Sequence, residues 1–179
     1  MAALPHSQLM GSTEYGRGQN RRLAEARMEQ VIEREAPIEV NELFRRVLES
    51  FGVKRAGIDV RNKNNEILAG IKCQRALFQD RTYVWREEDV PREYCCFRVE
   101  GLRDIDGFAP EELVAALRYT LRGRRRGLEG GELIKAASRA LGFRRTGGKI
   151  EETMRAALDL ACKDGAIVCG FGYYRLPDE

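Results

Sequence analysis

The sequence lacks most of the features that catalysis, membrane insertion and secretion require. Its single histidine, His6, argues against a histidine-based catalytic triad. No run of about 18 apolar residues occurs, which excludes a membrane-spanning helix. Residues 1–16 lack the basic patch and apolar core of a secretory signal, and neither a GxxxxGKS/T phosphate loop nor an HExxH zinc motif is present. We therefore predict that the protein is not an enzyme, has no catalytic residues and has no membrane partner.

Cysteine pairs suited to a metal ion are also missing. The five cysteines are Cys73, Cys95, Cys96, Cys162 and Cys169, an odd number with no CxxC pair. Structural zinc sites need closely spaced cysteines and histidines, and adjacent cysteines are poorly placed to share one ion. Buried, reduced thiols in the cytosol are the favoured interpretation, with a redox role for Cys95–Cys96 as the alternative. We predict a cytoplasmic protein with no metal, no cofactor and no disulfide.

What the sequence does contain is an internal repeat. Hydrophobic residues make up 43% of the chain and charged residues 33%, the composition of a folded protein. A shift of 90 positions superposes two halves without a gap. The identical residues are Glu39, Glu42, Leu43, Gly52, Arg55, Gly57, Leu68, Ala76 and Tyr83, which fall on Glu129, Glu132, Leu133, Gly142, Arg145, Gly147, Leu158, Ala166 and Tyr173. We predict repeats at 20–88 and 108–177, a connecting segment at 89–107 and a flexible tail at 1–19.

Each repeat has the same predicted order of elements: helix, short extended stretch, second helix, basic turn, third helix and β-hairpin. Apolar residues with a helical period predict the second helix of the first repeat, with Asn41 as its N-cap. Hairpins are predicted at 76–85 and 166–176. The fold class is thus mainly α with small β-hairpins (α+β), as two tandem winged-helix units, each a helix-turn-helix plus a wing.

Several stretches also resemble a known family. They are EAPIEVNEL at 35–43 with Arg45-Arg46, FGVKRAG at 51–57, LRDID at 102–106, APEEL at 109–113 and ALGFRRTG at 140–147. Together they resemble a bacterial domain family of unknown function, which forms the C-terminal end of very large superfamily-one helicase-like proteins with a restriction-endonuclease-like fold. The resemblance covers roughly residues 20–170 and implies an accessory role beside a helicase or nuclease polypeptide. The ATPase and nuclease parts are not in this sequence, so no enzymatic role is carried over.

Basic residues are concentrated where a winged helix meets nucleic acid. Segment 118–149 contains ten basic and two acidic residues, and segment 53–75 contains six and two. Each phosphate that Lys or Arg neutralises releases counterions, so affinity would come mainly from the nucleic-acid backbone. We predict a nucleic-acid-binding module, with DNA favoured over RNA. The predicted contacts are Lys54, Arg55, Arg61, Lys63, Arg124, Arg125, Arg126, Arg144, Arg145 and Lys149.

Other side chains leave alternatives open. Asn62 and Asn65 share a helix face and could read adenine edges. The hairpin aromatics could stack on bases or pack over the hairpin; they are Tyr83, Trp85, Tyr173 and Tyr174. Glu151 and Glu152, at the start of the third helix of the second repeat, would repel phosphate. They favour the alternative function, a winged-helix module for protein–protein interaction or dimerisation.

Overall fold

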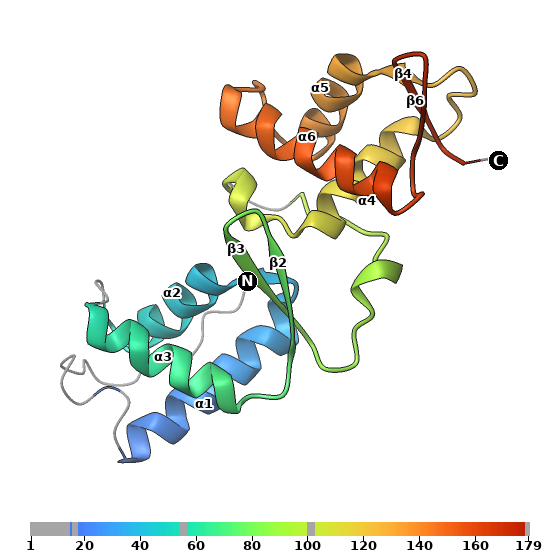
Figure 1. The fold of residues 1–179 in the computed structure, drawn as a ribbon. Coiled ribbons are helices and arrows are strands. Elements are labelled where there is room, and N and C mark those ends of the chain that lie inside the picture. The colour runs from blue at the N-terminus through green and yellow to red at the C-terminus, as the bar shows by residue number, and fades with distance from the viewer. Residues whose placement is uncertain (1–14, 16–17, 54–56, 100–102, 178–179) are drawn as a thin grey trace. The chain divides into compact units, whose positions relative to one another are not determined.

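The computed structural model describes residues 15, 18–53, 57–99 and 103–177, which belong to two compact units (Figure 1). Unit 1 comprises residues 1–89 and unit 2 residues 90–179. Within the described residues, each unit contains three α-helices and one three-stranded antiparallel sheet. This confirms the predicted combination of helices with small antiparallel sheets. No helix in this part of the chain is long and apolar enough to cross a membrane.

Unit 1 alternates helices with a sheet built from distant strands. Its elements are α1 (Gly18–Glu35), β1 (Ile38–Glu39), α2 (Val40–Ser50), α3 (Ile58–Gly70), β2 (Gln74–Phe78) and β3 (Arg81–Trp85). The strand order is β1-β3-β2, so the hairpin strand β3 lies between its neighbour β2 and the distant β1. Ile38 faces Val84 across this sheet, which ties the start of α2 to the hairpin.

Unit 2 repeats this order of elements. They are α4 (Pro110–Leu121), β4 (Leu128–Glu129), α5 (Gly130–Ala140), α6 (Gly148–Lys163), β5 (Val168–Gly170) and β6 (Tyr173–Arg175), preceded by the 3-10 helices η1 (Pro91–Glu93) and η2 (Ile105–Gly107). The strand order is β4-β6-β5. Helices α2 and α5 begin and end 90 positions apart, as do β1 and β4, the same offset as in the sequence.

Helix α2 shows how the sequence sets a local boundary. Leu43, Phe44, Val47 and Leu48 lie on its buried face, as the helical period predicts. The predicted N-cap, Asn41, is wrong. The cap is Glu39, whose carboxylate accepts a hydrogen bond from the Glu42 backbone N–H at 3.0 Å. Asn41 instead lies in the first turn and donates to the same carboxylate, because the helix follows directly from β1.

The core of unit 1 contains two buried polar contacts. Tyr15 donates to the Asn64 side-chain oxygen at 2.5 Å, and both side chains are fully buried. Arg27 donates to the Ser50 backbone and hydroxyl oxygens at 2.7 and 2.6 Å, with its guanidinium over the Phe51 ring. Tyr15 lies in the segment predicted to be flexible, yet it is anchored here. Of the five polar residues 61–65 on α3, Asn64 is the one that is buried.

The equivalent positions of unit 2 are apolar. Ile105 occupies the position of Tyr15, Met154 that of Asn64, and Leu117 that of Arg27. All three are buried. The same arrangement of helices therefore accommodates polar side chains at these three positions in unit 1 and apolar ones in unit 2.

Two further predictions need correction. Residues Ala166 and Ile167, predicted as strand, donate to the Ala161 carbonyl at 2.8 and 3.1 Å and close the end of α6, so β5 begins only at Val168. The prediction of buried cysteines is wrong for Cys95, Cys96 and Cys169, which are exposed, while Cys73 and Cys162 are half-buried. Cys169 lies on the edge strand β5, whose three residues are all exposed.

Candidate nucleic-acid interface

The predicted cationic residues lie at helix starts and turns. Lys54 and Arg55 are outside the described residues. In unit 1, Arg61 is exposed and Lys63 half-buried on α3. In unit 2, the three arginines 124–126 lie in the turn between α4 and β4, and Arg144-Arg145 lie in the turn between α5 and α6.

Their charges are mostly not neutralised within the chain. Within the described part of the chain, no carboxylate forms an ion pair with Arg61, Lys63, Arg124, Arg125, Arg126, Arg144 or Arg145. Lys149 differs, because its ammonium pairs with Asp106. The turn arginines are therefore available to an external anion, whereas Lys149 already has a carboxylate partner.

The structure does not bring the two basic turns of unit 2 into one cluster. They lie at opposite ends of α5, which has 11 residues and is therefore about 16 Å long (Figure 1). Two exposed cations, Lys135 and Arg139, lie between them on this helix. Sequence reasoning did not assign these residues a role, although their spacing of four positions places them on one helix face.

Beside these two cations lies a shallow surface hollow of about 310 Å³, here called the α5 hollow. It is lined by Arg124, Leu128, Glu132, Lys135, Ala136 and Arg139. Arg124 is held there by a hydrogen bond from its Nε to the Thr120 carbonyl at 3.1 Å. Three cations and one carboxylate thus surround the apolar side chains of Leu128 and Ala136.

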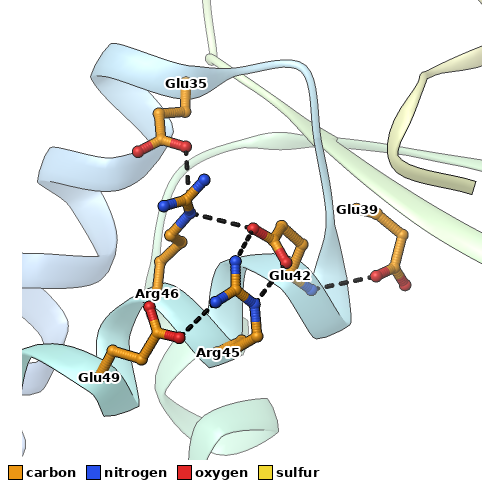
Figure 2. A network of polar contacts seen from close by, with 6 residues as sticks. All are labelled: Glu35, Glu39, Glu42, Arg45, Arg46 and Glu49. Carbon is orange, nitrogen blue, oxygen red and sulfur yellow. Dashed lines mark hydrogen bonds and ion pairs between the residues drawn. The ribbon is translucent and has the colours of Figure 1, made fainter. Parts of the chain in front are cut away.

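The equivalent face of unit 1 is filled and neutralised (Figure 2). Arg45 forms ion pairs with Glu42 and Glu49, and Arg46 reaches Glu42 at 3.0 Å and Glu35 at 3.6 Å. The hydrogen bond that Arg45 donates to Glu42, with the charges of Glu42 and Glu49, raises the pKa of Arg45. This face therefore offers little unsatisfied charge to a ligand.

The third helices of the two units have opposite character. Helix α3 exposes Arg61, Asn62 and Asn65. Helix α6 exposes Glu151 and Glu152 at the positions equivalent to Arg61 and Asn62, and Glu151 pairs with Arg155 at 3.0 Å. At these two positions a polyanion would thus meet an arginine and an amide on α3, but two carboxylates on α6.

Burial decides between the two roles considered for the hairpin aromatics. Tyr83 and Trp85 are buried and therefore pack rather than stack on a ligand. Tyr173 remains 53% exposed. The structure adds Phe171, which sequence reasoning missed. It is fully exposed in the β5–β6 turn, at φ 52°, a conformation that bulky residues rarely adopt.

Comparison with known proteins identifies one family. A family model described as "Protein of unknown function (DUF3320)" matches residues 18–62. These residues span α1, β1, α2 and the first turn of α3. The match confirms the predicted resemblance to a family of unknown function over this part of unit 1. No curated protein and no solved structure matches the chain.

Proposed function

We propose that the chain is a non-catalytic nucleic-acid-binding module that binds DNA mainly through its phosphates. The observation that carries this proposal is the set of exposed turn arginines that no carboxylate in the described residues neutralises. An arginine fork can grip two phosphate oxygens at once, and each contact releases counterions. Affinity should therefore be high at low salt and fall steeply as salt is added.

We further propose that each unit is a winged helix. The order of helix, strand, helix, helix and hairpin supports this assignment, together with a sheet in which the first strand pairs with the last. In this arrangement α3 would enter a groove with Arg61, Asn62 and Asn65 facing the bases. Unit 2 would bind through its two basic turns instead, because Glu151 and Glu152 on α6 repel phosphate.

Fluorescence anisotropy with labelled duplex DNA, single-stranded DNA and duplex RNA tests this function. The double variant Arg144→Glu/Arg145→Glu should weaken duplex binding at least tenfold and lower the salt slope by about 2, since each phosphate contact contributes about 0.9. The control is Arg21→Glu/Arg155→Glu, with the same change of charge at two exposed, ion-paired arginines. Equal losses in both variants would reject a specific role for the turn.

The resemblance to the helicase-associated family extends this proposal to an accessory role beside a helicase or nuclease polypeptide. The exposed acidic start of α6 favours a second candidate function, a protein-interaction or dimerisation module. Light scattering after size-exclusion chromatography separates the two. A dimer that persists at high salt and after nuclease treatment would favour the second function over the first.

A further inference from the structure

We propose that the α5 hollow binds an acidic segment of another protein, in which carboxylate side chains flank an apolar one. This goes beyond the proposed binding of nucleic acid, because it concerns a different ligand and a surface that lies between the two basic turns and shares only Arg124 with them. The argument comes from comparing equivalent positions in the two units.

In unit 1 this place is occupied by the protein's own side chains. The long arm of Arg46 covers the face of α2 and its guanidinium ends between Glu35 and Glu42 (Figure 2). Unit 2 has Ala136 at the position of Arg46, so the arm is missing and the hollow is open. The space in unit 2 is thus the volume that a side chain fills in unit 1.

Two of the three carboxylates that neutralise this face of unit 1 are replaced in unit 2, and the third, Glu42, is retained as Glu132. Arg125 occupies the position of Glu35, and Arg139 that of Glu49. Lys135 occupies the position of Arg45, which in unit 1 is bonded to two carboxylates. Among the residues that the structure describes, none forms an ion pair with Arg124, Lys135 or Arg139. Carboxylates supplied by a partner would restore the arrangement seen in unit 1.

The lining of the hollow favours a protein segment over a nucleic acid. Leu128 and Ala136 offer an apolar floor that an aliphatic side chain can cover, whereas a phosphate backbone gains nothing there. Glu132 lies in the lining and repels phosphate and carboxylate alike, but it can accept a hydrogen bond from a peptide N–H, a donor that a sugar-phosphate backbone does not offer. The volume of about 310 Å³ is at the lower end for ligand pockets and suits a few side chains.

Titration of the full chain with a fluorescein-labelled peptide of alternating glutamate and leucine tests the proposal. The same peptide with glutamine in place of glutamate serves as the uncharged control. The peptide should bind with a salt-sensitive affinity, shift the backbone NMR signals of α5 and β4, and lose at least tenfold in affinity with Lys135→Glu/Arg139→Glu. Equal binding of the glutamine peptide would overturn the proposal.

The decisive variant is Ala136→Arg, which fills the hollow with the residue of unit 1 and adds a positive charge. We expect it to weaken peptide binding at least fivefold and to leave duplex DNA affinity unchanged or slightly higher. Peptide affinity equal to that of the parent chain would overturn the proposal. A loss of DNA binding without a loss of peptide binding would also overturn it, because that result would assign the hollow to the nucleic-acid interface. A failure of the proposed nucleic-acid-binding function is detected separately, by the DNA titration of Arg144→Glu/Arg145→Glu.

Discussion

Among single residues, the buried pair Tyr15 and Asn64 occupies positions that are apolar in unit 2. Tyr15 and Asn64 are 49 positions apart, yet the buried Tyr15 hydroxyl donates to the buried Asn64 side-chain oxygen. Burial is the main cause that raises the pKa of the Tyr15 hydroxyl, so it remains a donor throughout the physiological range. Removing only one partner of such a pair destabilises the folded state, because the remaining polar atom is left without its hydrogen bond.

The Tyr15–Asn64 pair leads to a prediction about coupling. Tyr15→Phe should lower the free energy of unfolding by about 1–3 kcal/mol, because the Asn64 oxygen loses its donor. Tyr15→Ile with Asn64→Met, the residues of unit 2, should cost less than the sum of the two single changes. Urea unfolding of the parent chain, Tyr15→Ile, Asn64→Met and the double variant gives the four free energies of this double-mutant cycle. Additive losses would show that the pair is not coupled.

Phe171 combines an unfavourable backbone with an exposed ring. Phe171→Asn should stabilise the hairpin by about 1 kcal/mol, because asparagine tolerates a positive φ better than a bulky residue does. If the wing contacts nucleic acid, the same change should weaken single-stranded DNA binding by about 1–3 kcal/mol through lost stacking. Thermal unfolding and anisotropy measure the two effects. A loss of both stability and binding would instead indicate a structural role for the ring.

Glu111 should make stability depend on pH. Burial is the main cause that raises its pKa above the ordinary value of 4.5. The folded protein therefore binds this proton more tightly than the unfolded chain, so the contribution of Glu111 to stability is lost as pH rises from 4.5 through the folded pKa. Glu111→Gln should gain stability relative to the parent chain across this interval. Urea unfolding from pH 4 to 7 checks the sign, and a constant difference would contradict it.

At the scale of elements, one buried carboxylate holds the start of α4 to the segment before it. Glu112 accepts hydrogen bonds from the Ala109 backbone N–H at 3.1 Å and from the Arg98 guanidinium at 2.9 and 3.1 Å. Arg103 approaches it at 3.7 Å. The extended stretch that contains Arg98 is thus fixed to the helix by charge rather than by a strand.

Removing this carboxylate should destabilise unit 2. Glu112→Ala is expected to cost about 3 kcal/mol, because it removes the buried carboxylate that Arg98 and Arg103 share and the side chain that caps α4. Glu151→Ala, on the exposed face of α6, is the control and should change stability by about 0.5 kcal/mol or less. Thermal unfolding distinguishes them, and similar losses would contradict the anchoring role.

At the scale of the whole molecule, the two units divide their charge differently on equivalent surfaces. The second helix is self-neutralised in unit 1 and cationic in unit 2, while the third helix exposes Arg61 and Asn62 near its start in unit 1 and two carboxylates at the same positions in unit 2. If nucleic acid is the ligand, the acidic start of α6 limits how closely unit 2 can approach it.

Replacing Glu151 and Glu152 should strengthen the binding of duplex DNA. Glu151→Arg/Glu152→Asn gives α6 the residues of α3 at the equivalent positions, and duplex affinity should rise about tenfold with a steeper salt slope. Glu87→Arg/Glu88→Asn makes the same change at exposed positions after β3 and serves as the control. Anisotropy at two salt concentrations measures both. An equal gain in the control would show that only net charge matters.

The order of elements and the offset of 90 positions could be predicted from the sequence alone, because helix faces, strand alternation and turn residues are local properties of the chain. It also located the exposed turn arginines in unit 2. Which charged side chains form ion pairs could be seen only in the tertiary structure. Lys149 pairs with Asp106 across 43 positions, and the Asn64 side-chain oxygen accepts from Tyr15, a residue before α1. Ion pairing and burial depend on distances between elements, and those distances exist only once the helices pack.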